Sequence, residues 1–283
     1  MLLSINGATT MKATLPEDVA AARVAGFRAL EIWAAKMDTY LESHSVGNLK
    51  ALFDPPSASG PGLLPASINS IEFITFRPPD EYAEAVVGRC RELCALAQAL
   101  GCGKIVVVPS PTPEGATWRQ IRDESVRVLR ELSDVAAPHG VQLAFEFLGF
   151  SWCSVRTLAQ CWEIVAETAR DNVGLVIDTC HFYAGGSTLD AIDPVPPQKI
   201  LIFHINDVEE RQLETIEDAH RLLPGEGVIP LDDVLERLKR TGFDGLCSVE
   251  LFRPEYWERD PAELAAAARS ATLAVVGGYF EAA

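Results

Sequence analysis

GLVIDTCHF, residues 174–182, begins as a buried β-strand and ends with a carboxylate that precedes an imidazole by three positions. The Val, Leu and Ile residues of 173–177 form the apolar run of a strand covered on both faces, as in a parallel sheet. An ionised Asp178 at the end of such a strand is costly unless a cation compensates it. The stretch therefore predicts a parallel sheet with a charged group at its carboxyl end.

Short apolar runs alternate with longer helical patterns on both sides of this stretch. The predicted strands are 2–6, 28–33, 63–69, 104–108, 141–147, 173–178, 199–204 and 246–251. The predicted helices are 16–25, 45–53, 79–100, 117–137, 155–169, 188–192, 231–240 and 261–280. Eight such units are the number that closes a (β/α)₈ TIM barrel. No G-x-G-x-x-G turn follows the first strand to favour a doubly wound sheet, and no linker divides the chain. We expect one barrel domain over residues 1–283.

The composition narrows the class of protein. Lys and Arg number 24 against 40 Asp and Glu, so the net charge of −16 repels nucleic acid and anionic membranes and suits a small neutral polyol or ketose. The N-terminus has no signal-peptide pattern, and the apolar runs are too short to span a membrane. Seven scattered cysteines without a C-x-x-C pair indicate reduced, buried thiols. These features predict a cytoplasmic protein.

Four consecutive predicted strands end with a side chain that can bind a metal. They are Glu146, Asp178, His204 and Glu250. Taken alone, any one of them is as consistent with a satisfied core residue or a surface ion pair as with a metal ligand. However, no Lys or Arg lies within these strand ends to pair with the three acids. Together they favour a divalent cation, and the oxygen-rich set suits Mn²⁺ best, with Zn²⁺, Co²⁺ or Mg²⁺ as alternatives. Cys247 has an odd offset from Glu250 and faces the other side of the strand, which disfavours a thiolate ligand.

Further polar residues lie on the same rim of the predicted barrel. His181 follows Asp178 by three positions, and Asp207 follows His204 by three, where we expect it to orient that imidazole or to bond a substrate hydroxyl. The Gly-rich stretch 220–234 contains Arg221, the one cation near the rim. We interpret this stretch as a positioning loop. A phosphate cradle is the alternative, but Glu226 in its middle would repel a phosphate.

Four residues end the first three predicted strands. They are Asn6 after the first strand, Glu31 and Trp33 on the second, and Asn69 after the third. Ordinary loop capping explains each of these residues as well as a role in the site does. Among these residues, Trp33 and Asn69 are our candidates for contacts with a substrate.

Several motifs in this order resemble those of the xylose-isomerase-like barrels, which include ketose 3-epimerases, inosose dehydratases and endonuclease IV enzymes. Within that group the chain is most similar to the inosose isomerases (2-keto-myo-inositol isomerases) of bacterial inositol catabolism. The matching stretches are ATT at 8–10, ELSDVAAPHGV at 131–141, LAFEF at 143–147, DNVGLVIDTCHF at 171–182, FHINDVE at 203–209, RLLPGEG at 221–227 and SVELFRPEYW at 248–257. The loop after strand five and the end of strand two depart from the family's pattern, and both shape the pocket.

The resemblance implies a role for each rim residue. A metal would be held by Glu146, Asp178, His204 and Glu250, and the two glutamates would double as an acid/base pair. His181 and Arg221 would contact substrate oxygens. The implied reaction moves a carbonyl to the adjacent carbon of a keto-inositol through a cis-enediolate.

The sequence leaves other activities open. The same chemistry would serve a ketose 3-epimerase or an inosose dehydratase. An AP endonuclease-like DNA repair enzyme needs more metal ligands and a basic face, and five histidines with a charge of −16 argue against it. A non-catalytic sugar-binding barrel would contain no metal. The Ala-rich C-terminal helix packs most simply on the barrel, although it would also suit the interface of a homo-oligomer.

Overall fold

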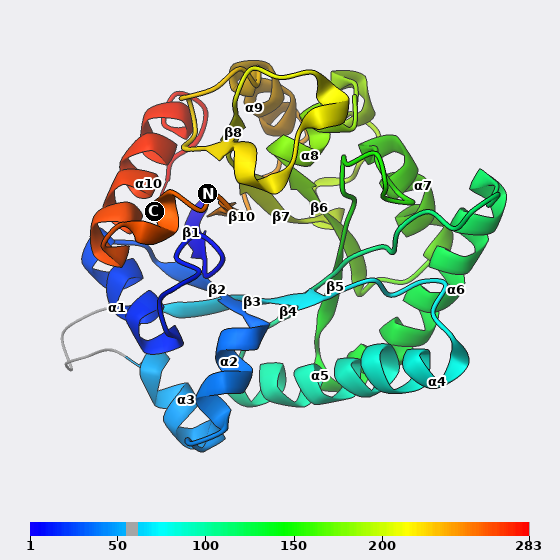
Figure 1. The fold of residues 1–283 in the computed structure, drawn as a ribbon, viewed down its shortest axis with the longest axis horizontal. Helices are drawn as coiled ribbons and strands as arrows, with labels where there is room; N and C mark the ends of the chain where they lie inside the picture. The colour runs from blue at the N-terminus through cyan, green and yellow to red at the C-terminus, as the bar shows by residue number, and fades with distance from the viewer. Residues whose placement is uncertain (55–61, 283) are drawn as a thin grey trace.

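Eight parallel strands close into a barrel in the computed structural model, which describes residues 1–54 and 62–282 (Figure 1). Around the barrel they follow the order β1-β10-β7-β6-β5-β4-β3-β2. Their bounds are β1 Leu2–Asn6, β2 Ala29–Trp33, β3 Leu64–Ile71, β4 Lys104–Val107, β5 Gln142–Glu146, β6 Val173–Asp178, β7 Ile200–Ile205 and β10 Leu246–Val249. The predicted (β/α)₈ barrel is confirmed, and each predicted strand lies within two residues of its predicted bounds.

Helices surround the barrel and cover the outer faces of its strands (Figure 1). Their bounds are α1 Leu15–Ala25, α2 Ala34–Leu41, α3 Val46–Phe53, α4 Pro79–Glu81, α5 Arg89–Leu100, α6 Trp118–Ala136, α7 Leu158–Thr168, α8 Thr179–Ala184, α9 Leu231–Arg240 and α10 Pro261–Val276. None of the helices in the described part of the chain is long and apolar enough to cross a membrane.

The helical predictions were less complete than those for the strands. The single helix predicted over 79–100 is divided into α4, a π-helical segment η1 (Tyr82–Gly88) and α5. The predicted helix 188–192 is a 3₁₀ turn at Leu189–Ala191. Two helices, α2 and α8, and the antiparallel hairpin of β8 (Asp207–Val208) and β9 (Arg221–Leu222) were not predicted.

Local capping residues set several helix boundaries. Thr14 and Glu17 form a reciprocal capping box at the start of α1, and Gly26 ends that helix in the left-handed region at φ 85°. Thr117 and Thr157 each accept a hydrogen bond from the backbone N–H three residues later, at the starts of α6 and α7. These side chains satisfy N–H groups that a helix end leaves without an intrahelical partner.

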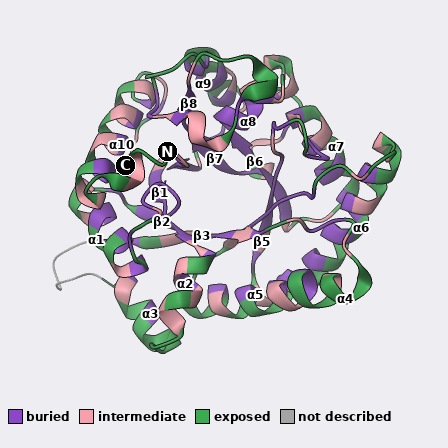
Figure 2. Ribbon diagram, viewed as in Figure 1, coloured by how far each residue is buried: buried purple, intermediate pink, exposed green. Residues whose placement is uncertain are grey.

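Side chains alternate between the two faces along each strand, and this alternation directs the polar residues of the rim into the barrel. Ala144, Val176 and Ile202 belong to a small apolar cluster shared by adjacent strands. Two residues further along the same strands come Glu146, Asp178 and His204, which therefore face the same way as the apolar layer, towards the barrel axis. Figure 2 shows the barrel strands almost entirely buried, so these polar groups lie in a region with little access to water.

Candidate metal centre

Four side chains converge at the carboxyl ends of β5, β6, β7 and β10. One potential ligand atom from each of Glu146, Asp178, His204 and Glu250 lies within 4.8 Å of the other three. All four residues are buried, with exposed fractions of 3% or less. The structure thus brings together the residues that we predicted as ligands, and their ligand role stays a prediction.

The carboxylates of this cluster compete for limited positive charge. Burial, together with the nearby negative charges of Glu146 and Asp178, raises the pKa of Glu250 to about 8. Burial acts on Asp178 in the same direction, but Arg221 and the neighbouring imidazoles outweigh it and lower its pKa to about 2. The cluster therefore has a deficit of cations at Glu250, which a divalent ion would relieve.

His204 lies at the centre of the cluster with its two nitrogens facing opposite ways. Its Nδ1 is 2.8 Å from Glu146 Oε1, 3.5 Å from Glu250 Oε2 and 3.9 Å from Asp178 Oδ2. Its Nε2 is 2.9 Å from Glu31 Oε1, outside the cluster. Burial lowers the pKa of His204, but the surrounding carboxylates outweigh that effect and raise it well above its usual value.

Arg221 supplies the cation that the strand ends lack. It comes from the β8–β9 hairpin and is 1% exposed. Its Nη1 donates to Asp178 Oδ2 at 2.8 Å and to Glu250 Oε2 at 3.0 Å. Its Nε donates to Asp218 Oδ1 at 3.0 Å. We expected no Lys or Arg within the strand ends, and the compensating guanidinium instead reaches them from a connecting hairpin.

The contact between Arg221 and His181 fixes the proton of that imidazole. Arg221 Nη2 is 3.0 Å from His181 Nε2, and a guanidinium only donates hydrogen bonds. Nε2 must therefore accept, which places the proton of a neutral ring on Nδ1. Burial lowers the pKa of His181, in keeping with a neutral ring. Its Nδ1 has no hydrogen-bond partner among the described residues, so it is available to donate to a bound molecule.

A cavity of about 250 Å³ borders the cluster, and the predicted substrate contacts other than Asp207 line it. It is lined by Trp33, Asn69, Ser70, Glu72, Phe73, Val108, Glu146, Leu148, Trp152, His181, Asp218, Arg221, Glu250 and Phe252. The ring of Trp33 meets that of Phe252 edge-on, with centroids 5.6 Å apart. Aromatic walls beside charged groups suit a ring that carries both C–H faces and hydroxyls.

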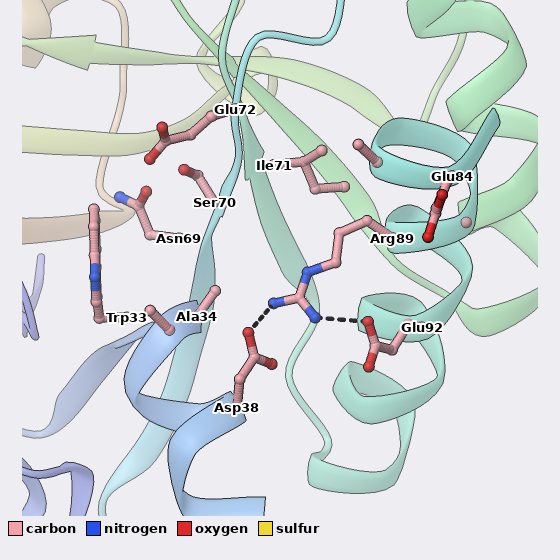
Figure 3. A pocket seen from close by; sticks show the side chains of 13 residues that line it. Trp33, Ala34, Asp38, Asn69, Ser70, Ile71, Glu72, Glu84, Arg89 and Glu92 are labelled. Atoms are coloured by element: carbon pink, nitrogen blue, oxygen red, sulfur yellow. Dashed lines mark hydrogen bonds and ion pairs between the residues drawn. The ribbon is translucent and has the colours of Figure 1, made fainter. Parts of the chain in front are cut away.

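A larger hollow of about 640 Å³ adjoins this cavity (Figure 3). The two share Trp33, Asn69, Ser70 and Glu72 as lining residues. Arg89 occupies the far side of the larger hollow and is 2.6 Å from both Asp38 Oδ2 and Glu92 Oε2. The polar lining of the site therefore extends outward between α2 and α5.

Asp207 is held by backbone N–H groups, and the structure shows it in contact with neither His204 nor the cavity. Its carboxylate accepts from the backbone N–H groups of Val208 at 2.9 Å, Gly225 at 3.1 Å and Ile229 at 2.9 Å. It makes no recorded hydrogen bond to His204 and does not line the cavity. The physical reason is that the glycine-rich loop before α9 presents several N–H groups that need an acceptor, and Asp207 supplies it. This agrees with the prediction of a positioning loop.

Three residues of β1, β2 and β3 hold the cluster from the other side of the barrel. Asn6 Nδ2 is 3.0 Å from Glu250 Oε1 and 3.3 Å from Glu31 Oε1, and Asn69 Nδ2 is 2.9 Å from Glu250 Oε1. Loop capping was the alternative for these residues, and for Glu31 the structure shows a wholly buried contact with His204 instead. The signal for Glu31 was present, since it is the one charged residue in the apolar strand ALEIW.

The cysteines match the prediction of buried thiols, because all seven are buried and free. Cys180 lies in a second group with Asp178 and His181. Burial raises the pKa of Cys180 well above its usual value, and it raises that of Cys247 to about 12. Both are therefore neutral thiols in the metal-free protein.

Comparisons with known proteins agree with this geometry. A family model described as a xylose isomerase-like TIM barrel matches residues 19–273. The chain is 36% identical to an inosose isomerase of Bacillus velezensis over 282 residues, 99% of each chain. It is 39% identical to that of Bacillus subtilis over 216 residues, 76% of this chain and 77% of the other.

Solved structures give the same result. A structure described as IolI protein with a bound zinc atom superposes with a TM-score of 0.94 at 36% identity, covering 99% of this chain and 100% of that one. D-Psicose 3-epimerase of Clostridium cellulolyticum superposes with a TM-score of 0.75 at 21% identity, covering 99% of this chain and 100% of the other. The second likeness shows a shared fold alone.

Proposed function

The chain belongs to the xylose isomerase-like TIM barrel family and, within it, to the inosose isomerases, and from this premise we propose that it is a metal-dependent isomerase of a keto-inositol. The reaction moves a carbonyl to the adjacent carbon of the ring. The observation that carries the proposal is the buried cluster of Glu146, Asp178, His204 and Glu250 beside a small polar cavity, in a chain 36% identical to inosose isomerases over its whole length.

The donor set fits a divalent cation. Three carboxylates and one imidazole are ligands that Mn²⁺, Mg²⁺, Co²⁺ and Zn²⁺ all accept. The raised pKa of Glu250 reflects its burial first and then the neighbouring carboxylates, so a cation there would be favourable. Mn²⁺ is the ion that we propose from this oxygen-rich set, whereas the related IolI structure contains zinc. Elemental analysis of protein purified without a chelator distinguishes the two.

A cation bound by these four residues would act as a Lewis acid towards the substrate carbonyl and its neighbouring hydroxyl. Glu146 and Glu250 come from strands separated by β6 and β7 and reach the cavity from different sides. One of them removes the proton from the hydroxyl-bearing carbon, and the other returns a proton to the former carbonyl carbon, while the hydroxyl proton passes to the former carbonyl oxygen. Each such transfer typically contributes a factor of about 10²–10⁴ to the rate.

Glu146 and Glu250 differ in the number of hydrogen bonds that hold their carboxylates. Three donors hold Glu250, since Asn6 and Asn69 bond its Oε1 and Arg221 bonds its Oε2, whereas Glu146 is bonded only to His204 among the recorded side-chain contacts of the described residues. We propose that Glu250 keeps a fixed place while Glu146 adjusts to the substrate. The Nδ1–H of His181 and the guanidinium of Arg221 then donate to substrate oxygens, which gain negative charge in the enediolate.

Proton NMR of 2-keto-myo-inositol with the enzyme in D₂O tests the proposed function. We expect an isomeric inosose to form, with deuterium at the carbon that loses its carbonyl. Inversion at one carbon without movement of the carbonyl would assign a 3-epimerase instead, and loss of water would assign a dehydratase. An isomeric inosose without deuterium would overturn the enediolate mechanism, and absence of any product in metal-loaded protein would overturn the enzymatic proposal altogether.

A further inference from the structure

We propose that Glu31 is a positioning residue that fixes which nitrogen of His204 binds the metal. By accepting the proton of Nε2, it leaves the lone pair of Nδ1 directed at the other three ligands. Because this role exists only if the cluster binds a cation, it rests on the proposed function. It adds to that function a residue on β2, a strand that supplies none of the four ligands.

The geometry allows only one arrangement of protons when Nδ1 carries a metal. A neutral imidazole has one N–H and one lone pair, and a metal requires the lone pair. The nitrogen that faces Glu146, Glu250 and Asp178 is Nδ1, at 2.8, 3.5 and 3.9 Å. Nε2 is 2.9 Å from Glu31 Oε1, and a carboxylate accepts but does not donate. When a cation lies among Glu146, Glu250 and Asp178, Nδ1 supplies the lone pair, and Nε2 keeps the one proton of the ring and donates it to Glu31.

Glu31 is itself held from both neighbouring strands. In the barrel register it pairs with Asn6 on β1 and with Ser67 on β3. Asn6 Nδ2 is 3.3 Å from Glu31 Oε1, and the Ser67 hydroxyl donates to Oε2. Glu31, Ser67 and His204 are completely buried. The carboxylate therefore cannot turn away from the imidazole without leaving buried donors unpaired, a costly change.

The position of Glu31 around the barrel explains why it can act on His204. In the strand order, β10 and β1 separate β7 from β2, so the imidazole reaches across the barrel interior to this carboxylate. Without an acceptor there, the ring would lose its anchor and would exchange between two tautomers and two ring orientations. Loss of such a carboxylate partner typically weakens metal binding about 10–100-fold.

Three variants separate positioning from the mere presence of a buried charge. Glu31→Leu removes the acceptor with little change in volume, and Glu31→Gln keeps an oxygen that can accept from Nε2. Asp18→Asn is the matched control, because Asp18 is also a buried carboxylate but is held by Lys36 at 2.8 Å and lies outside the cluster. The dissociation constant for Zn²⁺ is measured for each by competition with a chromophoric chelator.

We expect Glu31→Leu to weaken Zn²⁺ binding by about 10–100-fold, Glu31→Gln by less, and Asp18→Asn to leave it unchanged. A spectroscopic readout accompanies the affinities. In protein labelled with ¹⁵N-histidine and loaded with ¹¹³Cd²⁺, NMR should show cadmium coupling to Nδ1 of His204 and a proton on Nε2. The spectrum of the unmodified protein decides the question even if Glu31→Leu fails to fold.

The outcomes distinguish this role from the metal centre on which it rests. If the unmodified protein binds neither Zn²⁺ nor Cd²⁺, both the metal centre and the role of Glu31 are wrong. If the protein binds metal through Nε2, or if Glu31→Leu binds Zn²⁺ as tightly as Asp18→Asn, then only the role of Glu31 is wrong.

Discussion

Replacing Arg221 by methionine tests how the buried carboxylates are compensated. Arg221 is 1% exposed and donates to Asp178 at 2.8 Å and to Glu250 at 3.0 Å. Removing one partner of a buried ion pair typically costs about 3–5 kcal/mol, because the other charge stays buried without compensation. The bond to Asp218 adds little, since that side chain is 43% exposed and is screened by solvent. We therefore expect Arg221→Met to lose about 3–5 kcal/mol of unfolding free energy in the absence of metal.

Guanidinium chloride unfolding, followed by circular dichroism in EDTA, measures this loss. The same titration with excess Zn²⁺ should return part of it, since a ligand at 100 times its dissociation constant stabilises the folded state by about 2.7 kcal/mol. The variant should gain more from a given Zn²⁺ concentration than the unmodified protein does. Removing a positive charge beside two ligands eliminates its repulsion of the incoming cation.

Arg122→Met is the matched control. Arg122 also contacts several carboxylates, at 2.8 Å from Asp123, 3.2 Å from Glu163 and 3.2 Å from Glu167, but it lies on the surface of α6. An exposed network of this kind contributes little to stability, because solvent screens its charges. The claim that Arg221 compensates the buried carboxylates is refuted if the two variants lose equal stability in EDTA. It is also refuted if Zn²⁺ stabilises Arg221→Met less than it stabilises the unmodified protein.

Three further predictions follow from the site. Glu146→Gln and Glu250→Gln should each abolish turnover with an unchanged circular dichroism spectrum, and deuterium exchange into substrate that persists in both would contradict their assignment as the acid/base pair. Metal binding should release protons, and its affinity should increase as the pH rises towards about 8, because the raised pKa of Glu250 leaves a proton that the metal must displace. Calorimetry in buffers of different ionisation enthalpy measures this proton release. An affinity that does not change between about pH 6 and 8 would contradict the prediction. Asp207→Ala should lower stability by about 1–3 kcal/mol and raise KM, since it leaves backbone N–H groups of the loop without an acceptor, while Zn²⁺ affinity stays unchanged. A large loss of Zn²⁺ affinity in this variant would instead show that Asp207 orients His204.

The fold and the four-residue cluster were predictable because both follow from local patterns. An apolar strand with a polar residue at its end recurs along the chain, and period-2 alternation directs Glu146, Asp178 and His204 to the same side as the apolar layer below them. Closing the strands into a barrel then makes convergence unavoidable. The helices were harder to predict. α8 has only six residues and begins directly after β6, with the Asp178 side chain as its N-cap, and α2 begins directly after β2 without a side-chain cap.

Arg221 shows what the local pattern does not contain. The pairing of its guanidinium with Asp178 and Glu250 depends on a two-residue strand, β9, that bonds β8 in an antiparallel hairpin. Neither segment is long enough to show alternation. The sequence placed Arg221 near the rim, but its burial and its partners depend on how this hairpin folds back over the barrel. The same folding gives Asp207 its contacts with the glycine-rich loop.

The contact between Glu31 and His204 was not predicted for a different reason, and the balance of charge shows why this contact matters. The rule that made Asp178 conspicuous, a charge in an apolar strand, applies equally to Glu31, but its partner lies across the barrel on β7, where only the strand order reveals it. With Glu31 included, four buried carboxylates surround His204, and the buried cations recorded beside them in the described chain are Arg221 and the imidazole itself. With all four carboxylates ionised and that imidazole protonated, two negative charges remain. A divalent cation would balance them, and under our proposal Glu31 is the carboxylate that lets His204 give up its Nδ1 proton to make room for it.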